Sequence, residues 1–139
     1  MGFFTLELAR MVGRSGRVVA VDVQPRMLDG LRRRARRAGL LDRIDARRGA
    51  ADRLGVEDLA GRVDFVLAFA VVHEMPSAER FFAEAAAAMR PGATLLLAEP
   101  GGAIPEEEFA VEIASAGKAG LRVRERPGLR FGRSAVLVR

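Results

Sequence analysis

The sequence predicts a doubly wound α/β fold with a mostly parallel sheet, and three observations lead to this class. Residues 18–22, 63–72 and 93–98 are apolar runs of strand length, as expected for strands buried on both faces of a parallel sheet. Segments with apolar residues at helical spacing separate these runs. Two further strand-like segments, 123–126 and 134–138, follow one another without a helix, so they are expected to pair antiparallel as an edge hairpin.

The first part of the chain reads as helix, strand and helix. Residues 2–12 have roughly helical apolar spacing, with Thr5 as the expected cap. After the strand 18–22, Pro25 suits the first turn of a helix that runs to about Ala38. Its apolar residues form one stripe, and the arginines between positions 32 and 37 fall on the other side, which predicts a solvated face.

The remaining elements continue the alternation. Residues 43–48 are a weak strand candidate, and residues 49–61 are polar and rich in turn formers. Ser77 is the expected N-cap of a helix over 78–89, which the Arg-Pro-Gly sequence at 90–92 ends. Another helix is predicted over 105–119, with three glutamates in its first turn, where the helix dipole favours negative charge.

The composition bounds the class of protein. A chain of 139 residues that is 50% apolar suits a single domain, residues 1–139. The absence of cysteine excludes disulfides, and the one histidine without a cysteine or histidine partner predicts no metal site. No apolar run reaches the roughly 18 residues that span a membrane, and no signal-peptide pattern is present. We therefore expect a cytoplasmic protein without membrane association.

The basic character raises nucleic acid as a partner, because the net charge is +5 and the pI is about 11.2. All but one of the 23 basic residues are arginine, which is typical of a genome-wide codon bias that fills solvated faces. Tyrosine and tryptophan are absent, which weakens the case for base stacking. We expect no specific nucleic-acid binding.

The carboxylate at the end of the first strand carries the main functional hypothesis. Ligands of open α/β sheets bind outside the carboxyl ends of the strands. An acid about twenty residues after a glycine turn is where a ribose hydroxyl is held, and Gly2 precedes Asp22 by that interval. The sequence therefore predicts a nucleoside-type cofactor with its ribose on Asp22. The alternative role for Asp22 is a helix N-cap.

Five segments, in this order and spacing, resemble the class I S-adenosylmethionine-dependent methyltransferases over nearly the whole chain. They are MGFFT at 1–5, the strand ending in Asp22 with Gln24 and Met27-Leu28 after it, DFVLAFAVVHE at 64–74, the Arg-Pro-Gly turn followed by LLLAEP at 95–100, and RFGRSA at 130–135. The resemblance implies S-adenosylmethionine as cofactor and methyl transfer to an acceptor, expected to be a small molecule.

The resemblance also implies an N-terminal truncation. Members of the family open with a strand and a glycine-rich loop, and Gly2 resembles the last glycine of that loop. The first strand lies in the middle of the family's sheet, between the strands read here as 18–22 and 63–72. Without it, these two strands either pair directly or leave a gap. We expect the gap, with low activity and with poor solubility or homo-oligomerisation.

The resemblance assigns cofactor-binding residues on the first part of the chain. Gly2 would lie beside the cofactor, Asp22 would accept hydrogen bonds from both ribose hydroxyls, and Val23 and Met27 would lie along the adenine or ribose. Core packing is an equal alternative for Val23 and Met27. The family often has Gly-Asp-Ala where this chain has Gly49-Ala50-Ala51, so the backbone amides of Ala50 and Ala51 are expected to replace the carboxylate that binds the adenine amino group.

Further site residues follow the strand 63–72. Phe69 and Ala70 stand at the family's cofactor-facing corner, with core packing as the alternative for Phe69. His73 is the only histidine, and together with Glu74 it is the candidate base on the acceptor side. The alternative for His73 is a hydrogen bond to the backbone at the end of the strand. Asp22, Phe69 and the turn 49–51 are expected to converge at one edge of the sheet, beside Gly2.

Two other functions remain open. An NAD-type dinucleotide-binding domain also places an acid after its second strand. A catalytically inactive fragment that acts by protein or nucleic-acid contact fits the incomplete glycine loop and the arginine run. The Arg-Pro-Gly turn and the helix-free terminal pair favour the methyltransferase over the dinucleotide-binding domain.

Overall fold

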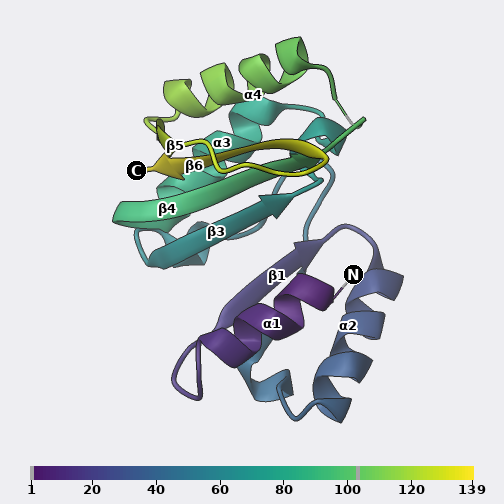
Figure 1. Cartoon of the computed structure of the whole chain (residues 1–139). Helices are drawn as coiled ribbons and strands as arrows, with labels where there is room; N and C mark the ends of the chain where they lie inside the picture. The colour runs from purple at the N-terminus through teal and green to yellow at the C-terminus, as the bar shows by residue number, and fades with distance from the viewer. Residues whose placement is uncertain (1, 103) are drawn as a thin grey trace. The chain divides into compact units, whose positions relative to one another are not determined.

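A computed structural model of the chain describes residues 2–102 and 104–139, so the Met1 of the resemblance lies outside the described residues. The chain divides into two compact units, Met1–Gly55 (unit 1) and Val56–Arg139 (unit 2). Figure 1 shows the elements of both. The prediction of a single domain over residues 1–139 stays a prediction, and each unit is described by itself.

Unit 1 is a small α/β unit with a two-stranded parallel sheet. Its elements are α1 (Phe3–Met11), β1 (Val18–Asp22), α2 (Pro25–Arg37), a 3₁₀ turn (Leu41–Arg43) and β2 (Ile44–Arg48). The register of the two strands runs from Val18 opposite Ile44 to Asp22 opposite Arg48. Parallel neighbours need a crossover connection, and α2 supplies it.

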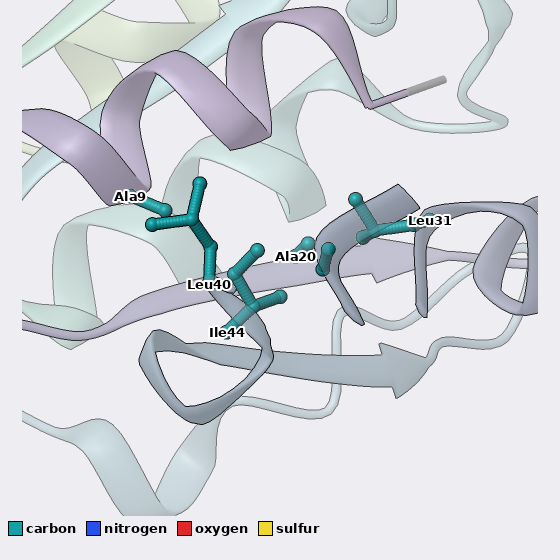
Figure 2. Packing of buried hydrophobic residues seen from close by; sticks show 6 residues of the cluster. Ala9, Ala20, Leu31, Leu40 and Ile44 are labelled. Carbon is teal, nitrogen blue, oxygen red and sulfur yellow. The ribbon is translucent and has the colours of Figure 1, made fainter. Parts of the chain in front are cut away.

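The core of unit 1 lies where α1, β1, α2 and β2 meet. Figure 2 shows Ala9, Ala20, Leu31, Leu40 and Ile44 packed together, each at most 9% exposed. The predicted apolar stripe of α2 supplies Leu31 to this core, together with Ala35. Most of the arginines of the run are exposed on the other face, which confirms that it is solvated; these are Arg33, Arg34, Arg36 and Arg37.

Unit 2 holds the larger sheet. Its elements are a 3₁₀ turn (Glu57–Leu59), β3 (Val63–Phe69), a second 3₁₀ turn (Val72–Glu74), α3 (Ala78–Ala88), β4 (Met89–Pro100), α4 (Glu106–Lys118), β5 (Arg122–Glu125) and β6 (Gly132–Val138). The strand order is β3-β4-β6-β5, with β3 and β4 parallel and β6 antiparallel to both of its neighbours (Figure 1). The predicted mostly parallel α/β fold with a terminal antiparallel pair is confirmed.

The ends of α1, α3 and β4 refine the predictions. Thr5 lies inside α1 and does not cap it; Gly2 takes the cap position with φ 111°, which favours glycine. Ser77 does cap α3, because its Oγ accepts the Arg80 N–H at 3.1 Å. The Arg-Pro-Gly sequence lies inside β4 as an irregularity, since the register passes from Val63 opposite Met89 to Phe65 opposite Thr94.

The strands at 18–22 and 63–72 are less buried than the sequence predicts, and the second is shorter. β3 ends at Phe69, and Phe65 and Phe69 are 42% and 39% exposed. In β1 only Ala20 is buried. Both are edge strands in the part of the chain that the structure describes, because β1 pairs only with β2 and β3 only with β4. β1 belongs to unit 1 and β3 to unit 2, so the choice between direct pairing of these strands and a gap stays a prediction.

Candidate functional site

Asp22 lies at the carboxyl end of β1, where β1 passes into the turn before α2. Its Oδ1 accepts the Gln24 N–H at 2.8 Å, and its backbone carbonyl accepts the Gly49 N–H at 3.0 Å. Gln24 is the N-cap residue of α2, so Asp22 itself does not occupy that position. Oδ2 accepts no hydrogen bond from any described residue. One carboxylate oxygen is therefore held by the backbone and the other remains for a ligand.

Two apolar side chains follow Asp22 and are not in the core. Val23 is 46% exposed and Met27 is 36% exposed, although Leu28 beside them is 2% exposed. The core-packing alternative for Val23 and Met27 is therefore not supported. Both offer apolar surface close in sequence to the carboxylate, as a planar base and ribose require.

Gly2 and Gly49 each occupy a place that a side chain would fill. At Gly2, where φ is 111°, an added Cβ would lie 3.0 Å from Arg34 Nη1. At Gly49 it would lie 2.8 Å from Val21 Cγ1 and 2.9 Å from the Arg53 carbonyl oxygen. The positive φ accounts for glycine at position 2, and close packing accounts for Gly49.

The turn after Gly49 leaves one of the two predicted amides for a ligand. The Ala50 N–H donates to the Arg53 carbonyl at 2.9 Å, and the Arg53 N–H returns a bond of 3.3 Å to Ala50. The Ala51 N–H makes no hydrogen bond within residues 2–102 and 104–139. Of the pair proposed to bind adenine, Ala51 is the amide that remains available.

In unit 2, a strained residue follows β3. Ala70 has φ 55° and is the only non-glycine residue with a positive φ among those described. Its N–H donates to the Ala98 carbonyl at 2.8 Å, which holds it against β4. A left-handed conformation of this kind costs on the order of 1–3 kcal/mol and is concentrated at functional sites. Phe69, just before it, is 39% exposed, so its side chain is not a core residue.

His73 is paired with a buried carboxylate that the sequence analysis did not single out. Its Nδ1 lies 2.6 Å from Glu99 Oε2, and the Glu99 side chain is completely buried. The side chain of His73 is 23% exposed, and its other nitrogen, Nε2, lies 3.9 Å from Oε1 of the exposed Glu74. The partner of His73 is therefore a side chain and not the backbone. Among the described residues, the Glu74 side chain makes only this distant contact.

A second buried acid, Glu112 on α4, completes this cluster. Glu112 is 5% exposed, and burial, together with the nearby Glu99, raises its pKa from 4.5 to about 7. Glu99 Oε1 and Glu112 Oε2 are both buried and receive no hydrogen bond from the described residues. Two carboxyl groups that face each other without a donor are satisfied when they share a proton.

Glu99 and Glu112 were not among the predicted site residues, although the sequence position of each indicates a special role. Glu99 ends the apolar run of β4, as Asp22 ends that of β1, so it is also an acid at the carboxyl end of a strand. Glu112 stands in the buried stripe of α4 between Phe109 and Ala116, where an apolar residue is the norm. An acid at such a position indicates a partner across the core.

The predicted site residues thus fall into two sets. Unit 1 contains Gly2, Asp22, Val23, Met27, Ala50 and Ala51, and unit 2 contains Phe69, Ala70, His73 and Glu74. Their convergence at one edge stays a prediction. No cluster of three or more residues suited to hold a metal ion occurs in the part of the chain that the structure describes.

Residues 1–92 match a protein family described as a methyltransferase domain. This chain belongs to that methyltransferase family. The match covers the segments around Gly2, Asp22 and His73, which favours the methyltransferase over the dinucleotide-binding domain. The search of curated proteins found no match.

Solved structures share the fold. A SAM-dependent methyltransferase from Aquifex aeolicus is 23% identical with a TM-score of 0.82, over 99% of this chain and 77% of that chain. A structure described as cofactor-bound Rv0187 from MTB is 25% identical with a TM-score of 0.73, over 99% and 67%. The cyclase SpnF is 19% identical with a TM-score of 0.75, over 91% and 50%.

The family and the methyltransferase neighbours support S-adenosylmethionine as the cofactor of this fold. The cyclase among the similar structures shows that the fold by itself does not fix the reaction. None of the described helices has the length and apolar character needed to cross a membrane.

Proposed function

We propose that this protein is a class I methyltransferase that transfers the methyl group of S-adenosylmethionine to a small-molecule acceptor. The observation that carries the proposal is Asp22 at the carboxyl end of β1, with one carboxylate oxygen fixed by the Gln24 N–H and the other left for a ligand. A carboxylate placed in this way suits the two hydroxyls of a ribose.

The residues around Asp22 fit the rest of the cofactor. Val23 and Met27 present partly exposed apolar surface for the adenine, and the free Ala51 amide suits one of its nitrogens. When bound, the cofactor supplies an activated methyl group on a sulfonium. The protein's contribution is then to position the acceptor in line with that group, which supplies most of the rate enhancement.

Calorimetric titration of the chain with S-adenosylmethionine tests this proposal. Asp22→Ala is expected to weaken binding by about 1–3 kcal/mol, the range for losing charge-assisted hydrogen bonds. Asp29→Ala is the matched control, because Asp29 is an exposed acid on α2 whose one ion pair among the described residues is with Arg32. Equal affinity of the Asp22→Ala and Asp29→Ala variants would remove Asp22 from the site.

For nucleic acid we propose only weak, salt-dependent attraction and no specific site, which the exposed arginine face of α2 supports.

The strand edges concern a different partner, a second copy of the chain. β1 and β3 each have one strand partner among the described residues, and unpaired strand edges favour association between copies of a chain. We therefore propose homo-oligomerisation, which sedimentation at increasing concentration tests.

A further inference from the structure

The buried cluster of His73, Glu99 and Glu112 has a definite hydrogen-bond direction. Glu99 lies in the middle, with Oε2 at 2.6 Å from His73 Nδ1 and with Oε1 left without a donor among the described residues. Glu112 approaches Glu99 from α4 and also has one oxygen without a donor. Glu99 can therefore receive two protons in hydrogen bonds, one from each neighbour.

Within the described residues, no arginine or lysine neutralises this cluster. Arg133 is the register partner of Glu99 on β6, but no ion pair joins the two side chains. Besides Glu99 and His73, the charged group that affects the pKa of Glu112 is Glu108, which is another acid on the same helix. A second negative charge beside Glu99 is therefore disfavoured, which agrees with the raised pKa of Glu112.

The geometry points to a positioning role for the two glutamates: neutral Glu112 donates to Glu99, Glu99 accepts the His73 Nδ1–H, and His73 Nε2 is thereby kept without a proton, as the base for an acceptor. This inference rests on the proposed methyl transfer for its reaction. It commits to an acceptor that must lose a proton on methylation, such as a weakly acidic hydroxyl group.

The proton and electron balance follows from this arrangement. With a bound sulfonium cofactor, the acceptor oxygen would bond to the methyl carbon as its O–H bond breaks, and His73 Nε2 would take the proton. The electron pair of the carbon–sulfur bond would remain on sulfur, which becomes a neutral thioether. Glu99 would stabilise the imidazolium, and the partly exposed edge of His73 would return the proton to solvent.

The tautomer of His73 tests the arrangement without any activity measurement. Since His73 is the only histidine, labelling the imidazole nitrogens with ¹⁵N gives the spectrum of this residue alone. We expect the neutral ring of the full chain to carry its proton on Nδ1. A neutral ring with its proton on Nε2 would overturn the proposal, whatever any variant does.

Two matched variants separate the roles of the glutamates. In Glu99→Gln, the Glu112 hydroxyl donates to the amide carbonyl, so the amide NH₂ faces Nδ1 and the neutral ring should switch to the Nε2–H tautomer. In Glu112→Gln, a neutral donor replaces a neutral donor, so the Nδ1–H tautomer should persist. An unchanged tautomer in Glu99→Gln, or a switched one in Glu112→Gln, contradicts the inference.

Two probe acceptors test the substrate class. Transfer of an isotopically labelled methyl group is measured to phenol, which loses a proton, and to benzoate, which does not. His73→Gln should lower the ratio of phenol methylation to benzoate methylation by roughly 10²-fold, the lower end for general base catalysis.

The outcomes distinguish this inference from the proposed function. Equal losses for both probes, or cofactor binding without transfer to phenol, would overturn the substrate class. Absence of cofactor binding would overturn the proposed function instead, while the tautomer spectra still decide the arrangement of the cluster.

Discussion

Two acids at the carboxyl ends of parallel strands have opposite environments in this protein. Asp22, at the end of β1, is partly exposed and bonded to the backbone N–H of Gln24. Glu99, near the end of β4, is completely buried and bonded to the side chain of His73. The same sequence feature thus produces an accessible ligand group in unit 1 and a buried hydrogen-bond acceptor in unit 2.

The neighbouring strands explain this difference. β1 has one strand partner, β2, among the described residues, so Asp22 ends an edge strand of the sheet in unit 1. β4 lies between β3 and β6, and α4 brings Glu112 against its end. A carboxylate inside a four-stranded sheet must find partners or lose its charge, whereas one at an edge remains hydrated.

Stability measurements on Glu99→Ala give the largest expected difference. Removing one partner of a buried pair leaves the others unsatisfied, so the free energy of unfolding should fall by about 3–5 kcal/mol. Asp22→Ala loses one hydrogen bond at a hydrated position, so it should cost only about 0.5–1.5 kcal/mol. Urea denaturation of both variants measures the two values. Equal values would mean that the two acids are not in different environments.

The pH dependence of the free energy of unfolding tests the buried environment of Glu99 and Glu112. The pKa of Glu112 is raised from 4.5 to about 7 in the folded chain, so between these values the folded state binds more protons than the unfolded state. Stability should therefore fall as the pH rises from about 4.5 to 7, by up to about 3 kcal/mol.

The variant Glu112→Gln isolates this contribution, because other carboxylates also titrate near pH 4. The wild-type chain should lose its advantage over Glu112→Gln across that interval, with no further relative change above it. A constant difference between the two from pH 4 to 8 would contradict the raised pKa.

Substituting Gly49, whose N–H donates to the Asp22 carbonyl, should have a smaller effect than changing the buried acids. In Gly49→Ala the new Cβ would lie 2.8 Å from Val21 Cγ1, so unit 1 should lose about 1–2 kcal/mol through overpacking. Gly117→Ala is the control, because that glycine lies in α4 with no atom within 4 Å of the new Cβ. The control should gain about 0.5–1 kcal/mol from helix propensity. Thermal unfolding of the two variants should therefore shift in opposite directions.

The sequence predicts the elements well, because apolar periodicity and capping residues act locally. The strand ending at Asp22, the Ser77 cap and the antiparallel terminal pair are all present. Burial is predicted poorly for β3, because whether Phe65 and Phe69 are covered depends on the strand's neighbours and not on its own residues.

In the candidate site, too, residues with a local signal were predicted and residues that depend on tertiary packing were not. Asp22 and His73 were found from their own positions, as a strand-end acid and the only histidine. Glu99 and Glu112 become meaningful only when β4 and α4 pack together and bring two acids from distant positions against one imidazole. No local pattern connects residues so far apart in the chain.

The backbone of Ala70 has a consequence for how this sequence responds to selection. With φ at 55°, alanine keeps a conformation that glycine adopts more easily. Laboratory evolution for heat resistance alone should therefore accept glycine at position 70 readily. If the fixed geometry after β3 contributes to turnover, evolution that also selects for methyl transfer should reject glycine at position 70. The substitutions recovered from the two libraries will show whether the strain is retained for function.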